Sequence, residues 1–407
     1  MTILSYFRCV RKRGRTMVPF VMLFYVAVIL MFVQYNFYEV WNTSVASPIR
    51  DGHGQDAREI VFFISVCKGE ADNRQGGKIA SDIDRQLRQT AVLLKSAAAL
   101  SSSVLRFKVV TDSEDLFHQI TNLTSSWPAD YQKRILMDYH KVWYPAERKD
   151  MRSMFRVCST ERLFIPEMFS DLDAGIYVDT DMLFLRPPEQ LWEEFQKFND
   201  VQLAALAPCL FHYDTNRNKL PYYGKTGLNA GVMLLNITRM KSFPEGGWMP
   251  ALIKVFDRIK KKMKLADQDI INVLFSKYPE LMYELGCEWN YRIFQCSKGT
   301  NKCPDAATNG ISLLHGNALA FVSGEEMKIQ AVFEAWERHV MGSSVSTLLT
   351  TLQQDLESVS TKHLPSKCAR IRRRGGAWEA FTEGGRSVWD TAGSPPRRSV
   401  KGASITL

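Results

Sequence analysis

The stretch IYVDTDMLFL, residues 176–185, is the segment that decides the fold of this chain. Its first half belongs to an apolar, β-rich run, and two carboxylates, Asp179 and Asp181, follow that run directly. Hard divalent cations prefer oxygen ligands of this kind. An Asp-x-Asp pair is a weak signal by itself, but its position after a buried strand indicates a metal site.

The same pair also occurs in phosphohydrolases, in which the first Asp is a nucleophile. Those enzymes usually carry Thr or Val two positions after the second Asp, and the motif lies early in their domain. Here Leu183 occupies that position, and the motif lies far into the folded part of the chain. The pattern therefore favours a metal ligand over a phosphohydrolase nucleophile.

Apolar β-rich runs alternate with helical patterns around this segment. Strands are predicted at residues 59–66, 105–112, 174–179 and 201–208, and helices at residues 85–100, directly after 112, 155–169 and 191–198. This alternation predicts an α/β fold, Rossmann-like, with a mixed and mostly parallel sheet. Ligands of such sheets bind beyond the carboxyl ends of the strands. Polar groups end the strands at Lys68, Asp112 and Asp179, so the sequence predicts a nucleotide site at that rim.

Residues 17–38 predict a transmembrane helix that precedes this domain. Residues 17–33 read MVPFVMLFYVAVILMFV without a charge, and the segment reaches the length of a membrane span. The preceding residues carry basic side chains and no acidic ones, which predicts a cytosolic tail at 1–16 and a luminal body. A cleaved signal peptide is the alternative, but the run is long and ends in bulky residues. We expect a single-pass type II protein of the Golgi or endoplasmic reticulum membrane.

The charge distribution argues against nucleic-acid binding. Of the net charge of +9, residues 1–33 contribute +5 and residues 341–407 contribute +5, so the body carries −1. Residues 39–58 predict a luminal stem, and residues 59–340 a catalytic domain. Residues 341–407 are Ser/Thr-rich and then Arg/Gly/Pro-rich without a core pattern, which predicts a disordered tail.

Two further features fit a luminal body. Three N-x-S/T triplets predict glycosylation at Asn42, Asn122 and Asn236. An oxidising lumen would permit disulfides among six cysteines: Cys67, Cys158, Cys209, Cys287, Cys296 and Cys303. Their pairing cannot be deduced from spacing. The last three lack C-x-x-C spacing, which favours a disulfide-braced loop over a zinc site.

Several stretches in one order carry a family resemblance. They are CSTERLFIP (158–166), YVDTDMLFLRP (177–187), PYYGKTGLNAGVMLLNITRM (221–240), ADQDIIN (266–272), CEWNYR (287–292) and LLHGN (313–317). Over residues 59–340 the chain resembles the family 8 retaining glycosyltransferases, and more narrowly the glucoside xylosyltransferases. The resemblance implies a GT-A fold and transfer of xylose from UDP-xylose to O-linked glucose on EGF-like repeats of a glycoprotein. It also implies an α-1,3 linkage and retention of the anomeric configuration.

The resemblance also assigns the metal and donor residues. Asp179, Asp181 and His315 match the metal ligands, and an imidazole among them suits Mn²⁺ better than Mg²⁺. Without the resemblance, His315 would be interpreted as a buried histidine after a strand. Arg162 could instead be a surface helix residue, and Asn229 could merely start a strand. The residues assigned to the donor site are Val66, Cys67, Arg162, Asn229, Gly316 and Asn317, with Lys328 as a replacement for a missing family lysine.

Asp267 and Gln268 match residues beside the anomeric carbon of the donor, where a side chain could stabilise an oxocarbenium-like transition state. Asp267 could also serve as the N-cap of the helix that follows. Trp289, Asn290 and Tyr291 match a stretch near the acceptor, although packing in the core is an equal alternative. No residue is assigned as a covalent nucleophile.

One departure from the family pattern concerns the diphosphate. Many members follow the metal histidine with Gly and then Lys-Pro-Trp, whereas residues 315–328 here read HGNALAFVSGEEMK. Lys328 or Lys225 could take the place of that lysine. Two other functions stay open: a family enzyme that uses another donor, such as UDP-glucose or UDP-galactose, and a catalytically silent luminal binding protein.

Overall fold

The computed structural model describes residues 59–68, 82–154, 158–210, 213, 220–299 and 301–359. These residues belong to one unit, which begins at Glu59. The predicted cytosolic tail, membrane anchor and stem lie outside the described residues, as does Asn42. Within the described part of the chain, no helix has both the length and the apolar character that crossing a membrane requires.

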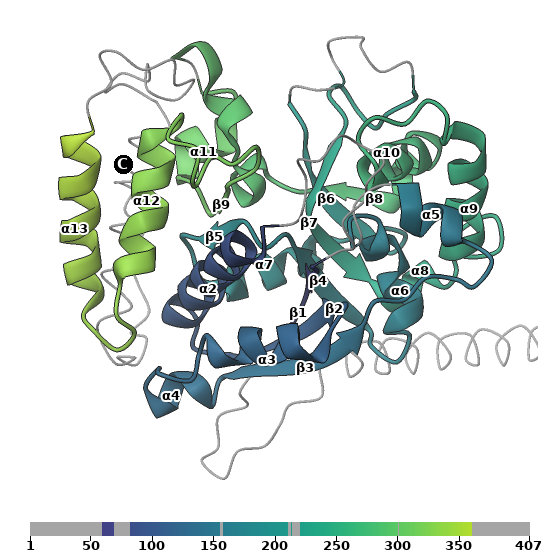
Figure 1. Cartoon of the computed structure of the whole chain (residues 1–407). Coiled ribbons are helices and arrows are strands. Elements are labelled where there is room, and N and C mark those ends of the chain that lie inside the picture. Colours follow the sequence, from purple (N-terminus) through teal and green to yellow (C-terminus); the bar gives the residue numbers. More distant parts are fainter. Residues whose placement is uncertain are drawn as a thin grey trace, which may run out of the picture. The chain divides into compact units, whose positions relative to one another are not determined.

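A seven-stranded sheet forms the centre of the structure, in the order β3-β2-β1-β4-β7-β6-β8 (Figure 1). Only β7 runs against its neighbours β4 and β6, and the other neighbouring pairs are parallel. The predicted mixed, mostly parallel α/β sheet is therefore confirmed. The strands are β1 (Glu59–Val66), β2 (Val104–Thr111), β3 (Ile135–Lys141), β4 (Ala174–Val178), β6 (Ala204–Pro208), β7 (Leu228–Asn236) and β8 (Met282–Glu284).

A second, two-stranded sheet consists of β5 (Met182–Phe184) and β9 (Leu313–His315). The strands are antiparallel, and Met182 lies opposite His315. This pairing brings a residue late in the chain beside the Asp-x-Asp segment that precedes β5.

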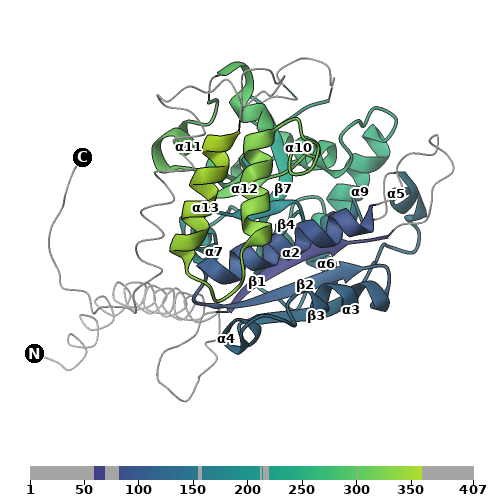
Figure 2. The same cartoon turned by 60° about the vertical axis from the view of Figure 1, so that its left-hand side comes forward.

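Helices cover both faces of the main sheet (Figures 1 and 2). Helix α2 packs against β5 and α12, which in turn packs against α13, while α10 packs against β7 and α9. The α-helices are α2 (Ile83–Leu100), α3 (Glu114–Asn122), α4 (Ala129–Gln132), α5 (Lys149–Met154), α6 (Ile165–Met168), α7 (Pro188–Glu193), α8 (Ile237–Met240), α9 (Trp248–Ile259), α10 (Asp267–Lys277), α11 (Pro304–Asn309), α12 (Met327–Arg338) and α13 (Val345–Ser358). Short 3₁₀ helices are η1 (Glu161–Phe164), η2 (Glu194–Lys197), η3 (Pro279–Leu281), η4 (Cys287–Asn290) and η5 (Ile293–Gly299).

The core lies where the central strands meet these helices. Strand β1 is apolar along almost its whole length because both of its faces are covered. The ring of Phe62 stacks on that of Phe107 at 5.2 Å between centroids and contacts Phe184 edge-on at 5.8 Å. This packing ties β1, β2 and β5 together beneath the rim that carries the polar residues.

Two sequence predictions of secondary structure need correction. The helix predicted at 155–169 is, in its described part, the short helices η1 and α6, preceded by Cys158 with a φ of 68°. The tail predicted to lack structure from 341 contains helix α13, whose Leu348, Leu352 and Leu356 are buried. That stretch is ordered because its leucines repeat at helical spacing and pack against α12.

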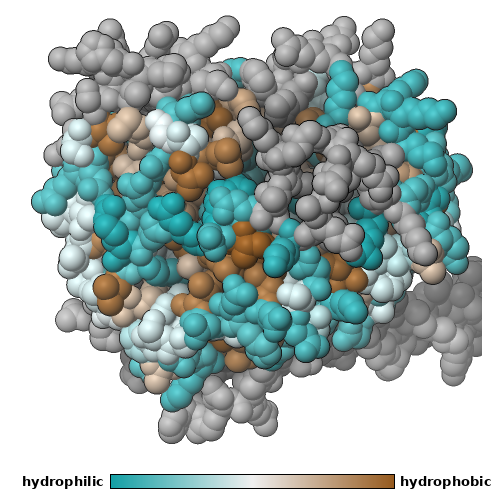
Figure 3. Space-filling view, in the orientation of Figure 1, coloured by the Kyte–Doolittle hydropathy of each residue, from teal (hydrophilic) through white to brown (hydrophobic). Residues whose placement is uncertain are grey.

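The large apolar side chains that are exposed on the described surface come from separate elements. They are Trp143, Val201, Leu319, Met327 and Val340. On the face drawn in Figure 3, apolar residues form several groups that polar residues separate. Scattered apolar side chains are normal on a protein surface, so they indicate no particular partner.

Candidate metal centre and active site

Three ligand atoms from Asp179, Asp181 and His315 lie within 4.8 Å of one another. His315 Nε2 is 3.7 Å from Asp179 Oδ2 and 3.3 Å from Asp181 Oδ1. Asp179 directly follows β4 and donates its backbone N–H to Gly231 O at 2.9 Å. His315 ends β9, and the next N–H, that of Gly316, donates to Asp181 O at 2.7 Å. Backbone bonds of both sheets therefore hold all three side chains.

The chemistry of these side chains fits a divalent cation. Two carboxylates and one imidazole offer oxygen and nitrogen donors. This ligand set suits Mn²⁺, whereas Mg²⁺ is suited by the carboxylates but less by the imidazole. The side chain of His315 is 5% exposed, whereas those of Asp179 and Asp181 are 23% and 25% exposed. The imidazole therefore forms the inner wall, and the carboxylates are reached from solvent.

Arg162 bridges the carboxylates of this region. Its Nη1 lies 2.8 Å from Asp179 Oδ1 and donates to Ala230 O at 3.1 Å, while its Nε lies 3.3 Å from Asp267 Oδ2. The guanidinium also stacks over the Tyr177 ring at 4.4 Å, and Tyr177 OH donates to Asp179 Oδ1 at 2.8 Å. Arg162, with a side chain 12% exposed, thus bridges two carboxylates, and the alternative of a surface arginine is wrong. Oδ2 of Asp179 still faces His315.

Asp267 is the first residue of α10 and is buried. Burial raises its pKa to about 6, although the charge of Arg162 acts in the opposite direction. The alternative role as N-cap is wrong, because the N-cap is Ala266, with a φ of 53°. Asp269 does hold the segment before the helix, since its carboxylate accepts from the backbone N–H groups of Lys264 and Leu265.

A chain of buried amides connects Gln268 to the metal histidine. Asn229 Nδ2 donates to Gln268 Oε1 at 2.7 Å, and Asn290 Nδ2 donates to Asn229 Oδ1 at 2.7 Å. Asn290 Oδ1 lies 2.8 Å from His315 Nδ1. The structure therefore brings together residues that the sequence assigned to separate catalytic, donor and acceptor groups.

The three residues that were predicted to contact the acceptor are buried, which argues against that role. Trp289 is 4% exposed, and Asn290 and Tyr291 are fully buried. None of these side chains offers an open platform for a sugar. The indole and the phenol pack in the core, and Asn290 serves the amide chain instead.

The structure places the remaining predicted donor residues in different environments. Val66 is fully buried, and Cys67 forms a disulfide with Cys158. A Cβ at Gly316 would lie 2.2 Å from Phe321 Cδ2, so packing alone requires glycine there. Among the other residues named for this site, Asn317 has a buried Oδ1 without a described partner, Lys328 is half-buried at the start of α12 and has a pKa lowered by burial, and Lys225 is exposed.

The cysteines and sequons are placed as follows. A second disulfide joins Cys287 to Cys303, so these sulfurs are not available as zinc ligands, and Cys209 is a buried free thiol. Asn122 is exposed at the end of α3. Asn236 instead caps α8, because its side chain accepts from the Arg239 N–H.

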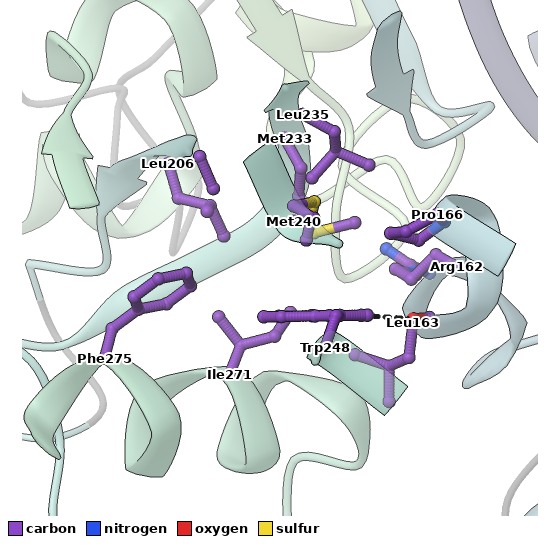
Figure 4. A pocket seen from close by; sticks show the side chains of 11 residues that line it. Arg162, Leu163, Pro166, Leu206, Met233, Leu235, Met240, Trp248, Ile271 and Phe275 are labelled. Atoms are coloured by element: carbon purple, nitrogen blue, oxygen red, sulfur yellow. Dashed lines mark hydrogen bonds between the residues drawn. The ribbon is translucent and has the colours of Figure 1, made fainter. Parts of the chain in front are cut away.

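A small apolar cavity lies beside Arg162, between α10 and β7 (Figure 4). Its wall includes Met233, Ile271 and Trp248, and Trp248 Nε1 donates to Leu163 O at 2.7 Å. Such a lining cannot bind a diphosphate. It places apolar side chains beside Arg162.

These features define an α/β protein with a divalent-cation site at the carboxyl edge of its sheet. Residues 27–318 match the family described as Glycosyl transferase family 8. The chain therefore belongs to this family of glycosyltransferases. The family match covers the sheet and the cation site, and it ends three residues after His315.

Individual relatives are also similar. The chain is 36% identical over 282 residues to glucoside xylosyltransferase 1 of Danio rerio, covering 66% of this chain and 69% of that protein. It is 33% identical over 300 residues to glucoside xylosyltransferase 1 of Gallus gallus, covering 70% and 67%. The crystal structure of mouse Xyloside xylosyltransferase 1 in its apo form aligns with a TM-score of 0.46 at 19% identity, covering 64% of this chain and 98% of that one.

Proposed function

We propose that this chain is a cation-dependent glycosyltransferase that moves xylose from UDP-xylose to an O-linked glucose on EGF-like repeats. The observation that carries the proposal is the convergence of Asp179, Asp181 and His315 at the sheet rim. The donor is taken from the relatives that are named glucoside xylosyltransferases. Mn²⁺ is the proposed cation, and the anomeric configuration is retained.

A bound cation would neutralise the charge that builds on the UDP leaving group. The residues of the chain supply the remaining functions. Asp267 lies next to Arg162 at the edge of the site, and its carboxylate can accept hydrogen bonds from sugar hydroxyls and stabilise positive charge on the sugar ring. Arg162 fixes the distance between Asp179 and Asp267 by contacting both.

The proposed location is the Golgi or endoplasmic reticulum membrane, with residues 17–38 as the anchor and the catalytic domain in the lumen. The disulfides Cys67–Cys158 and Cys287–Cys303 support an oxidising compartment. The exposed sequon at Asn122 also suits a luminal surface.

The test is a donor-hydrolysis panel on the full chain, with UDP-xylose, UDP-glucose and UDP-galactose, with and without Mn²⁺. We expect UDP-xylose to be the preferred donor and turnover to require the cation. Asp181→Asn should reduce turnover by more than about 100-fold, because even the outer partners of metal ligands cost 10- to 100-fold. Asp130→Asn, the same change on the exposed surface of α4, is the matched control.

The contrary outcomes separate the parts of the proposal. Cation-independent turnover, or an Asp181→Asn variant as active as Asp130→Asn, would remove the metal role. Preference for a hexose donor would overturn xylose and leave the family assignment intact. Binding of every donor without turnover would identify a silent binding protein.

A further inference from the structure

The direction of the buried amide chain is fixed by one backbone group. The N–H of Gly231 points at the amide of Asn229 and donates to its Oδ1 at 3.1 Å. A backbone N–H can only donate, so the Asn229 atom that faces it must be oxygen. The nitrogen of that amide is then the atom that donates to Gln268.

The next amide follows from the first. The Asn290 atom 2.7 Å from Asn229 Oδ1 must be a donor, which makes it Nδ2. The other end of the Asn290 amide is then Oδ1, which carries no hydrogen. This oxygen lies 2.8 Å from His315 Nδ1. The hydrogen of that bond can only come from the ring, so Nδ1 of His315 carries it.

The groups on the opposite side of the His315 ring favour a proton on Nε2 instead. His315 Nε2 faces the carboxylates of Asp179 and Asp181. In the absence of a cation, these two negatively charged hydrogen-bond acceptors would attract the ring proton to Nε2. A proton on Nε2 would occupy the lone pair that a metal ligand needs. The amide chain and the carboxylates therefore compete for the position of the same proton.

We propose that Asn290 is a positioning residue, which holds His315 as the Nδ1–H tautomer and keeps the Nε2 lone pair free for a divalent cation. The proposal rests on the cation-dependent function argued above. It assigns Asn290 to the metal site, whereas the sequence assigned it to the acceptor. Outer partners that fix the tautomer of a histidine ligand are a general feature of metal sites.

Gly231 supports the same arrangement from a second direction. A Cβ at this residue would lie 2.5 Å from His315 Cε1 and 2.9 Å from its Nδ1, so the imidazole packs directly against the glycine. The carbonyl of Gly231 accepts the N–H of Asp179 at 2.9 Å. One residue thus contacts a carboxylate ligand, fixes the amide chain and seats the imidazole.

Two substitutions at one position test the proposal. Asn290→Leu and Asn290→Asp are close to Asn in size, and both remove the amide N–H₂ group that donates to Asn229. Only Asp keeps an oxygen that can accept from His315 Nδ1. A merely structural role of Asn290 predicts that Asp is at least as harmful as Leu, because it also introduces a buried carboxyl. The positioning role predicts that Asp preserves the tautomer and Leu does not.

The first readout is ¹⁵N NMR of the full chain with labelled histidine rings, free of metal, at about pH 9, where an ordinary imidazole is neutral. The His315 signals are assigned by their loss in His315→Gln. We expect the proton on Nδ1 in the wild type and in Asn290→Asp. We expect a substantial Nε2–H population in Asn290→Leu. Because no metal or donor is present, a failure here is distinct from a failure of the proposed function.

The second readout is Mn²⁺ affinity, measured by EPR titration of free Mn²⁺. Asn290→Leu should weaken binding by about 10- to 100-fold, and Asn290→Asp by less than about 3-fold. A wild-type ring with its proton on Nε2 would overturn the proposal, and so would equal losses of affinity in the two variants. If circular dichroism shows that Asn290→Leu is unfolded, the wild-type and Asn290→Asp spectra still decide.

Discussion

Glu161 in the short helix η1 should make the stability of this protein decrease between acidic and neutral pH. The side chain is 1% exposed, and its Oε1 accepts from the Trp143 N–H at 2.8 Å. Its Oε2 is buried without a hydrogen-bond partner among the described residues. Burial raises the pKa of Glu161 to about 8, from an ordinary value of 4.5, with smaller opposing effects of the hydrogen bond from the Trp143 N–H and of the charge of Arg152. Glu161→Gln keeps the acceptor for Trp143 and removes the ionisation.

The sign and size of the effect follow from proton linkage. Between pH 4.5 and about 8 the folded protein keeps a proton on Glu161 that the unfolded chain has released. Stability is therefore full below the unfolded pKa and is lost as the pH rises towards the folded pKa, at about 1.4 kcal/mol per pH unit. The free energy of unfolding of Glu161→Gln, relative to wild type, should rise by about 2–3 kcal/mol between pH 5 and pH 7.

Urea unfolding of both proteins at several pH values measures this difference. The half-buried Glu167 and the buried Asp267 also have raised pKa values, but they are common to both proteins and cancel in the comparison. Glu193→Gln, on the exposed surface of α7, is the matched control and should change stability by less than about 0.5 kcal/mol at every pH. A difference for Glu161→Gln that does not depend on pH would refute the reasoning.

Three further substitutions test the packing of the domain. Cys158→Ser opens the disulfide to Cys67, which spans 91 residues, and should lower the free energy of unfolding by about 4–5 kcal/mol; no loss under non-reducing conditions would contradict this. Leu352→Ala in α13 should cost about 2–5 kcal/mol in the same assay, and a neutral result would mean that α13 does not pack on the domain. Gly316→Ala should cost about 1–3 kcal/mol because its Cβ would meet Phe321, and it should leave the wild-type pH dependence unchanged.

The sequence predicts four of the seven strands of the main sheet and misses β3, β7 and β8. Strands β1, β2, β4 and β6 lie where apolar runs were predicted, because strands covered on both faces are apolar throughout. Strand β3 was not predicted. It is an edge strand whose residues are mostly half-buried, and its sequence ILMDYHK lacks a long apolar run. The reversed direction of β7 cannot be deduced from local sequence, because it depends on which neighbours it pairs with.

The C-terminal boundary of the domain is a second feature that was not predicted from the sequence. Helix α13 repeats leucine at helical spacing, at Leu348, Leu352 and Leu356. Ser, Thr and Gln surround these leucines, so the composition of the segment indicates a polar linker. These leucines are buried because α12 provides a surface against which they pack, and that surface exists only in the folded domain.

The sequence also predicted one part of the candidate site and missed another. Asp179, Asp181 and His315 were predicted as metal ligands, the carboxylates from an Asp-x-Asp after a strand and the histidine from the family resemblance, and the structure brings the three together. Asn290 was predicted to lie near the acceptor, but it is fully buried and contacts Asn229 and His315. Its partners Asn229 and His315 lie 61 and 25 residues away along the chain, and no local pattern indicates that three polar side chains meet inside the core. A hint was present in Gly231, since a glycine inside an apolar strand often marks the close approach of another group.

Intact ligands are therefore not a sufficient sign of an intact metal site in this family of sequences. Asp179, Asp181 and His315 define which atoms can bind a cation, but whether Nε2 is free depends on Asn290. The direction of the Asn290 amide depends in turn on the N–H of Gly231. A change at either residue can close the site while every ligand remains. A relative that keeps the three ligands but has an apolar residue in place of Asn290 should bind Mn²⁺ weakly. A relative that has Asp in place of Asn290 should keep most of its Mn²⁺ affinity.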